Sequence, residues 1–291
     1  MTYQSETGFL QSVVIKPAAQ ALISQEKINE EWQALNFLNP PNLEKAKMEY
    51  QDFEKVLMQH GTTIHHLASE PTLTMDSMYC RDAAILTDHG ALLCRMGKPA
   101  RSGEPEAEEK LFRSLEIPIL GRIEAPGTLE GGDVAWLNDS TLAVGRTYRT
   151  NEEGIRQLKA ILQPFGVKVI VAELPHYKGP SDVFHLMSIL SPVAADLAVV
   201  YSPLMPVAFR ENLLNLGYRL VEVPEEEFNR IGCNVLALAP RVCLMVSGHP
   251  MTQQRLEHAG CTVITYAGEE ISIKGGGGPT CLTRPFKRII D

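Results

Sequence analysis

Leu213-Leu-Asn-Leu-Gly217-Tyr-Arg-Leu-Val-Glu-Val223 is the stretch that decides the fold, because within it a helix gives way to a strand. The leucines belong to a helical segment, and a glycine is favoured in the left-handed position just after a helix. The β-rich residues that follow predict a strand. The same pattern returns around Gly61, Gly166 and Gly260, and around Glu116, where glutamate stands in place of the glycine.

These five helix-to-strand junctions are regularly spaced, at intervals of 55, 50, 51 and 43 residues. Regular spacing of this kind indicates repeated supersecondary units. Between the junctions lie pairs of strands such as 133–137 and 141–145, so each unit contains strands, a helix and another strand. Such units can form a ring, a solenoid or two stacked domains, and five units without a polar capping repeat favour a ring. We therefore predict a single α/β domain over residues 1–291.

Helix starts are marked by capping residues. Asn42 precedes an apolar stripe made by Ala46, Tyr50, Phe53 and Leu57, and residues 150–153 have the form of a capping box. The remaining helices are expected over 102–115, 206–216 and 252–259. Residues 18–42 do not fit a unit and are a candidate lid.

Composition narrows the class of protein. With 44% hydrophobic and 21% charged residues, the chain has the composition of a globular protein. A net charge of −8 argues against nucleic acid as a partner. The sequence has neither an apolar run long enough to span a membrane nor the features of a signal peptide. We expect a cytoplasmic protein with six free cysteines. We expect no metal and no cofactor, and a homodimer is one possible assembly.

Four reactive side chains lie at similar offsets after the junctions. Asp82, Glu130 and His185 follow positions 61, 116 and 166 by 21, 14 and 19 residues, and Cys281 follows Gly260 by 21 residues. Taken singly, each has a plainer explanation: an ion pair with Arg81, a tight turn, a core histidine on a strand, a thiol after a flexible run of four glycines. Yet the glycines follow Ile271-Ser-Ile-Lys274, which resembles a strand and places them within folded structure. In a ring of similar units, however, similar offsets bring side chains to one centre. The fourth unit offers only Asn234, 17 residues after Gly217.

A cysteine, a histidine and two carboxylates suit a particular electrophile. A thiolate attacks carbon, and a histidine passes a proton to the leaving amine. Two carboxylates would oppose a developing oxyanion, but they accept paired hydrogen bonds from a planar guanidinium. The charge of that guanidinium would also lower the pKa of Cys281.

Six short motifs in order then carry a resemblance: Asp76-Ser-Met-Tyr-Cys-Arg-Asp82, Arg95-Met-Gly-Lys-Pro-Ala-Arg101-Ser-Gly-Glu104, Glu130-Gly-Gly-Asp-Val, Arg149-Thr-Asn, Phe184-His-Leu and Gly275-Gly-Gly-Gly-Pro-Thr-Cys281. With them the chain resembles the guanidine-modifying enzymes, which include dimethylarginine dimethylaminohydrolases, arginine deiminases and amidinotransferases. The resemblance spans most of the chain. It implies the pentein fold, a five-fold pseudo-symmetric α/β propeller of ββαβ-type units.

The resemblance also implies roles for individual residues. Cys281 would attack the guanidinium carbon, and His185 would protonate the departing amine and then activate water. Glu130 would bind guanidinium nitrogens and orient His185, while Asp82 would hold the other side of the group. The substrate's amino-acid end would be bound by Asp76, Arg101 and Arg149. Arg149 has independent support because it precedes a predicted helix N-terminus, which favours a carboxylate.

The substrate class follows from departures within the family pattern. Arg81 before Asp82 is similar to the arginine deiminases, whereas Met187 two residues after the histidine is more similar to the dimethylarginine hydrolases. The expected activity is hydrolysis of a small cationic guanidino substrate, a free arginine derivative, to citrulline or a relative of it plus an amine or ammonia. The alternatives are an amidinotransferase, in which an acceptor amine replaces water, and a non-catalytic binding protein on the same propeller.

Overall fold

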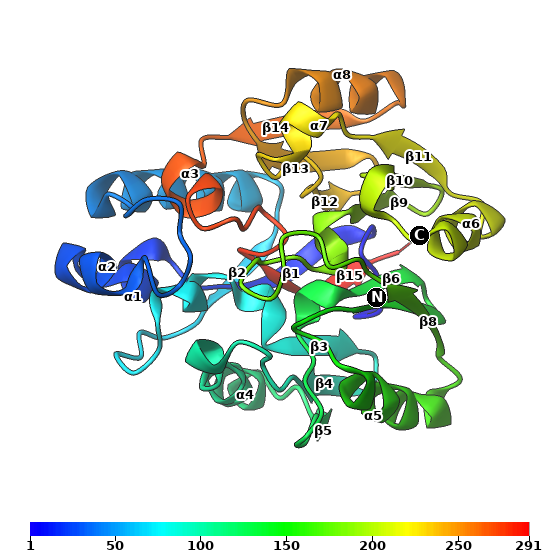
Figure 1. Cartoon of the computed structure of the whole chain (residues 1–291), viewed down its shortest axis with the longest axis horizontal. Coiled ribbons are helices and arrows are strands. Elements are labelled where there is room, and N and C mark those ends of the chain that lie inside the picture. Colours follow the sequence, from blue (N-terminus) through cyan, green and yellow to red (C-terminus); the bar gives the residue numbers. More distant parts are fainter. Residues whose placement is uncertain (291) are drawn as a thin grey trace.

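Five three-stranded sheets surround a common centre in the computed structural model of the chain, which describes residues 1–290 (Figure 1). In every sheet the middle strand pairs antiparallel with one neighbour and parallel with the other. The sheets are β3 (Ala84–Thr87), β4 (Gly90–Leu93) and β5 (Ile119–Arg122); β6 (Val134–Asn138), β7 (Thr141–Arg146) and β8 (Lys168–Glu173); β9 (Leu190–Ala194), β10 (Leu197–Val200) and β11 (Arg219–Glu222); β12 (Leu236–Ala239), β13 (Val242–Val246) and β14 (Thr262–Tyr266); and β15 (Arg284–Ile289), β1 (Phe9–Ile15) and β2 (Thr63–His66).

One long helix joins the two parallel strands of each sheet and lies on the outside of the ring (Figure 1). Each unit therefore has the order ββαβ, and the predicted five-fold α/β propeller is confirmed. A strand followed by a parallel strand needs such a crossover, which explains why every unit carries its own helix. The five helices are α3 (Leu43–Gln59), α4 (Glu104–Ser114), α5 (Glu152–Leu162), α6 (Val207–Asn215) and α8 (Pro250–His258).

The junctions behave as the sequence predicts. Gly61, Gly166, Gly217 and Gly260 have φ angles of +80°, +70°, +89° and +87°, all in the left-handed region. Glu116 has a φ of +59° at the equivalent position, although a glutamate has to accept steric strain to adopt it. The shared conformation shows that all five units leave their helices by the same turn.

The helix starts are partly as predicted. Asn42 accepts a hydrogen bond from the Lys45 backbone N–H at 3.0 Å and caps α3, whose apolar stripe is buried. The capping-box prediction for α5 is wrong by one residue, because Asn151 is the cap and accepts from the Gly154 N–H at 2.8 Å. Helix α8 begins two residues before the predicted position. Its first turn is capped from a distance by the Glu227 carboxylate, which no local pattern reveals.

Two predicted strands form helical turns instead. His185 directly precedes a 3₁₀ turn (Leu186–Ser188), where the Ser188 hydroxyl accepts from the His185 backbone N–H at 3.1 Å. The segment around Ile271 forms a π-helical turn (Glu269–Ile273). The Glu49 carboxylate accepts from the first backbone N–H groups of this turn and stabilises it from outside the segment. A short apolar run is ambiguous between strand and helix. In both turns a carboxylate distant in sequence accepts a backbone N–H bond, Asp133 from Leu186 and Glu49 from Glu270.

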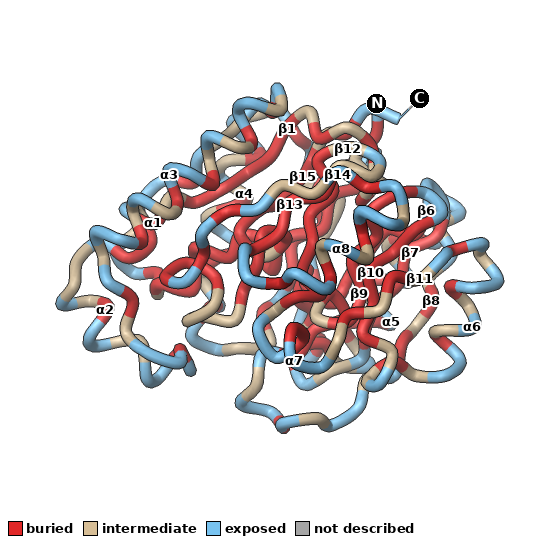
Figure 2. Tube along the Cα trace, turned by 90° about the horizontal axis from the view of Figure 1, so that it is seen from above, coloured by how far each residue is buried: buried red, intermediate tan, exposed pale blue. Residues whose placement is uncertain are grey.

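Buried residues fill the space between the sheets and their helices, and the outer helix faces are exposed (Figure 2). The short helix α1 (Ala18–Leu22) packs beside α3, and α2 (Gln25–Glu31) contacts α1. Helix α7 (Glu225–Phe228) lies in the connection between β11 and β12. Strand β1 lies between β15 and β2, so the first and last strands close the ring. Within residues 1–290, no helix combines the length and the apolar character needed to cross a bilayer.

Candidate active site

A cavity of about 310 Å³ receives side chains from all five units. Of the seven residues that the sequence singles out, six line it, and they come from four of the units. Asn234 supplies the wall from the unit that contains β12 and β13. Glu130 is fully buried and lies behind the lining, in contact with His185. The six are Asp76, Asp82, Arg101, Arg149, His185 and Cys281.

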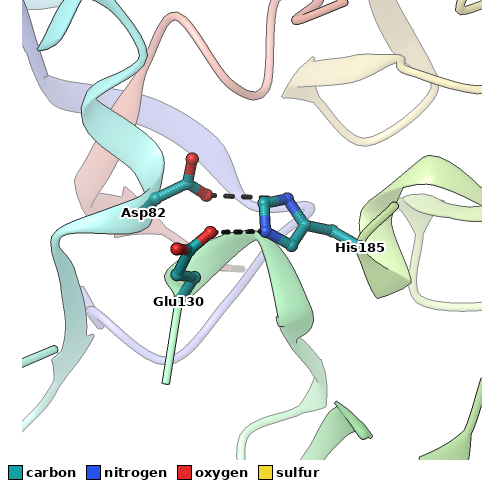
Figure 3. A group of neighbouring side chains, drawn as sticks. All are labelled: Asp82, Glu130 and His185. Carbon is teal, nitrogen blue, oxygen red and sulfur yellow. Dashed lines mark hydrogen bonds and ion pairs between the residues drawn. The ribbon is translucent and has the colours of Figure 1, made fainter. Parts of the chain in front are cut away.

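His185 is held between two carboxylates (Figure 3). Its Nε2 lies 2.8 Å from Glu130 Oε2, and its Nδ1 lies 4.0 Å from Asp82 Oδ1. Burial alone would lower the pKa of His185, but Asp82, Asp133 and Glu130 outweigh it and raise the pKa to about 9. At neutral pH the imidazole is therefore a cation with a proton to give.

Glu130 is ionised despite its complete burial. Burial raises its pKa, but His185, Arg101 and Arg149 outweigh that effect and lower the pKa to about 2. Its second oxygen, Oε1, accepts from the Lys98 backbone N–H at 3.0 Å and lies 3.6 Å from Arg149 Nη1. The carboxylate is thus fixed in place from both sides.

Asp82 is positioned by the backbone and by an arginine. Its Oδ1 accepts from the Gly132 N–H at 2.8 Å, and its Oδ2 pairs with Arg101. A Cβ atom on Gly132 would lie 2.5 Å from His185 Nδ1 and 2.6 Å from Asp82 Oδ1. The glycine therefore lets Asp82 and His185 approach each other, which gives a physical reason for the Glu130-Gly-Gly-Asp motif.

Arg101 has its nitrogen donors occupied within the protein. Nε and Nη2 bind the Glu104 carboxylate at 2.8 and 2.7 Å, Nη2 also donates to the Tyr79 carbonyl, and Nη1 binds Asp82. Burial raises the pKa of Glu104 to about 7 against the opposing pull of Arg101. In this structure Arg101 holds Asp82, and its role at the substrate's amino-acid end stays a prediction.

Arg149 has a free donor. Its side chain is buried, and within residues 1–290 its Nη1 finds no hydrogen-bond partner. Glu130 Oε1 lies 3.6 Å from this nitrogen, beyond hydrogen-bond distance, so an anionic group of a ligand would satisfy the buried donor. Asp76 is placed differently, because its carboxylate is paired with Lys98 Nζ at 2.6 Å.

Cys281 is partly exposed to the cavity, whereas the other five cysteines are buried. Its Sγ accepts from Asn234 Nδ2 at 3.3 Å, and Asn234 Oδ1 accepts from both the N–H and the hydroxyl of Thr280. These bonds fix which way the Asn234 amide points. Burial and the charge of Asp82 raise the pKa of Cys281, although Asn234 and Thr280 act in the opposite direction.

Three of the four glycines in 275–278 are packed closely against side chains, Gly276 being the exception. A Cβ atom on Gly275 would lie 1.9 Å from Tyr79 Oη, and one on Gly278 would lie 2.5 Å from Asn234 Oδ1. The run therefore lets Tyr79 and Asn234 pack onto the backbone that carries the thiol.

Asp82, Glu130 and His185 also form the one group among residues 1–290 whose ligand atoms could surround a metal ion, since these atoms all lie within 4.8 Å of one another. A metal-bound histidine needs a free, neutral ring nitrogen. Here Nε2 is hydrogen-bonded to Glu130, and the raised pKa keeps the ring protonated. The arrangement fits a planar cation with N–H donors better than it fits a metal ion.

Four residues near the cavity make contacts that the sequence does not indicate. Lys98 lies inside a quoted motif, but no pattern indicates that its ammonium reaches Asp76. Glu104 lies in one of the motifs, but the sequence does not indicate that its carboxylate binds Arg101. Asp133, whose pKa burial raises to about 6, holds the turn after His185 by accepting from the Leu186 N–H. The sequence indicates Asn234 only by its distance from Gly217, and its hydrogen bond to the Cys281 thiol is seen only in the structure.

The fold is shared with solved structures of guanidine-modifying enzymes. A Pseudomonas aeruginosa dimethylarginine dimethylaminohydrolase mutant complexed with citrulline matches with a TM-score of 0.77 and 24% identity, over 94% of this chain and 98% of that one. SxtG, an amidinotransferase from Microseira wollei, matches with a TM-score of 0.79 and 16% identity, over 99% and 97% of the two chains.

The chain is also similar in sequence to dimethylarginine dimethylaminohydrolases. The Pseudomonas aeruginosa dimethylarginine dimethylaminohydrolase is 29% identical over 81% of this chain and 90% of its own length, and the Streptomyces coelicolor enzyme of the same name is 30% identical over 74% and 76%. A family model described as N,N dimethylarginine dimethylhydrolase, eukaryotic, matches residues 18–288. The chain is therefore an enzyme that hydrolyses carbon–nitrogen bonds of linear amidines, and it belongs to the N,N-dimethylarginine dimethylhydrolase family.

Proposed function

We propose that this enzyme hydrolyses the guanidino group of an arginine-type compound through a covalent bond to Cys281. The observation that supports the proposal most strongly is the buried arrangement Asp82–His185–Glu130 beside a cavity that also contains the Cys281 thiol. Two carboxylates around one histidine leave acceptors for the N–H groups of a cation.

The bound cation would prepare the nucleophile. In the free enzyme, burial and Asp82 raise the pKa of Cys281, so the thiol keeps its proton. A guanidinium placed against Asp82 and Glu130 neutralises their charge and adds a positive charge near the sulfur, which favours the thiolate. The reactive form of Cys281 would therefore be produced mainly when substrate is present.

The reaction would proceed in two halves. The Cys281 thiolate attacks the central guanidinium carbon, and the amine or ammonia leaves with a proton from His185, giving a thiouronium bound to the enzyme. His185, now neutral, takes a proton from water, and the resulting hydroxide attacks the same carbon. The carbon–sulfur bond then breaks and releases the thiolate and a urea-containing product, citrulline or a relative of it.

The proposed binding of the other end of the substrate rests on Arg149. Its Nη1, which has no hydrogen-bond partner among residues 1–290, would donate to a carboxylate, and Asp82 and Glu130 would hold the guanidinium. Arg101 would act on the substrate indirectly, by holding Asp82 through its Nη1.

A colorimetric assay for urea-type products tests the proposal, with arginine, monomethylarginine and dimethylarginine in parallel. We expect product from at least one arginine-type compound and none from the Cys281→Ser variant. Activity of that variant near wild type would rule out the covalent route. If product forms only when an acceptor amine is added, the enzyme is an amidinotransferase. Identical inactivity of wild type and variant with every guanidino compound would favour a binding protein.

A further inference from the structure

The corner of the cavity where Asp76 lies already contains an ammonium group. Lys98 Nζ lies 2.6 Å from Asp76 Oδ2 and donates to the Leu35 carbonyl oxygen at 2.9 Å. The side chains of Lys98 and Asp76 are only 14% and 6% exposed. All three residues line the cavity, so the pair faces the space that a ligand would occupy.

A carboxylate together with a carbonyl oxygen is a set of acceptors suited to an ammonium. In this chain the protein fills that set with its own lysine. A ligand ammonium entering the corner would have to break a largely buried ion pair or lie next to a like charge. A free amino acid would meet this obstacle, because its α-ammonium accompanies its carboxylate.

The same region favours a carboxylate without an ammonium. Arg149 Nη1 is buried and has no hydrogen-bond partner among residues 1–290, and Lys98 adds a second cation to the cavity wall. Asp76 pairs with Lys98, and the Glu130 carboxylate lies 3.6 Å from Arg149 Nη1. Arg149 Nη1 still has a donor for a ligand carboxylate, whereas a ligand ammonium in this corner would lie next to the Lys98 ammonium and be repelled by it.

We propose that the substrate is a guanidino acid that lacks an α-ammonium group, and that Lys98 is the residue that selects it. The inference rests on the proposed function, because the guanidinium end is still held by Asp82 and Glu130. The reaction would convert the guanidino acid and water into the corresponding ureido acid and ammonia, or an amine if the guanidine is substituted.

Arginine and 5-guanidinopentanoate form a matched pair for the test, because they differ only in the α-ammonium. Binding is measured by titration calorimetry on the Cys281→Ser variant, and hydrolysis is measured on the wild type. We expect 5-guanidinopentanoate to bind at least about tenfold more tightly than arginine. Equal or tighter binding of arginine would overturn the inference.

Variants of Lys98 test the residue itself, each with the Cys281→Ser change. Lys98→Met leaves the backbone N–H that binds Glu130 in place and frees Asp76 and the Leu35 carbonyl. Its preference should shift toward arginine by at least about tenfold, whereas Lys98→Arg should keep the preference for the deaminated acid. Lys178→Met, at an exposed lysine of the same cavity, should leave the ratio unchanged. An unchanged ratio in Lys98→Met, with its thermal unfolding intact, would overturn the assignment.

The two proposals fail in different ways. If wild type hydrolyses arginine or methylarginines at least as efficiently as 5-guanidinopentanoate, the hydrolysis stands and the selection by Lys98 is wrong. If 5-guanidinopentanoate binds more tightly than arginine but wild type hydrolyses no guanidino compound, the selection stands and the hydrolysis is wrong.

Discussion

The pKa values of His185 and Cys281 are both raised, and this determines the protonation state of the site. With the pKa of His185 at about 9 and that of Cys281 above its usual value, the free enzyme holds an imidazolium and a thiol at neutral pH. In the proposed reaction, the His185 proton would go to the leaving amine, and the Cys281 proton would have to leave when the substrate binds. The two carboxylates create this state, because they stabilise the imidazolium and Asp82 opposes the thiolate.

The raised pKa of His185 predicts a pH-dependent contribution to stability. The folded-state pKa of about 9 exceeds the usual value of about 6.5, so the contribution is complete below pH 6.5 and is lost as pH rises through 9. The gap in unfolding free energy between wild type and His185→Gln should shrink by up to about 3 kcal/mol between pH 6 and 9.5. Chemical denaturation at several pH values measures it, with the exposed His258→Gln as control. A gap independent of pH would contradict the ion-pair geometry.

The position of Arg149 predicts that its loss affects substrates with a carboxylate more than substrates without one. Loss of a buried donor to a carboxylate should raise KM by about thirtyfold or more for substrates that carry a carboxylate. Agmatine, which is arginine without its carboxylate, should change much less in the Arg149→Ala variant. Steady-state kinetics on both compounds give the ratio, and Arg146→Ala, on an exposed surface pair, is the control. Equal changes for both compounds would show that Arg149 acts through Glu130 alone.

The helix-to-strand junction is the element that repeats, and Glu116 is its exception. A glutamate in the left-handed region is strained, whereas glycine at the four sibling positions is not. Glu116 is exposed, so Glu116→Gly should remove the strain without losing packing and raise stability by up to about 1 kcal/mol. Thermal unfolding measures the effect. The reciprocal change Gly166→Ala should destabilise, and the junction argument is wrong if both variants shift stability in the same direction.

Elements were predictable where the information is local. The left-handed glycines, the Asn42 cap and the hairpins each depend on a few neighbouring residues, and the structure has them in place. The turns at His185 and Ile271 donate backbone N–H bonds to the distant Asp133 and Glu49 carboxylates, and there the strand predictions failed. The start of α8 depends on Glu227 in the same way.

The residues of the candidate site also divide into those that the sequence pattern predicts and those that depend on distant contacts. Asp82, Glu130, His185 and Cys281 could be placed from offsets because the repeat carries them to equivalent positions. The Lys98–Asp76 pair and the closed hydrogen bonding of Arg101 could not, because they depend on side-chain directions that a repeat does not specify.

At the scale of the whole molecule, the ring makes every unit depend on its two neighbours. Arg288 on β15 is buried and donates to the carbonyls of Gly8 and Ala237, so the last strand is tied to the first and to the neighbouring sheet. We propose that residues 1–291 form one domain that unfolds in a single transition. Circular dichroism and the fluorescence of Trp32 and Trp136, measured in single-tryptophan variants, should give coincident urea curves. Separate midpoints would indicate two domains.

The pairing of β1 with β15 has a consequence for biosynthesis. A ribosome delivers β1 first, yet one side of that strand has no partner until β15 emerges at the other end of the sequence. Until then its unpaired edge can bind other chains, which is a hazard for a nascent protein. Cys281, the proposed nucleophile, is also the last of the reactive groups to be synthesised, after Asp82, Glu130 and His185. Contacts between such distant parts of the sequence form slowly, and ring closure should therefore coincide with the completion of the candidate site.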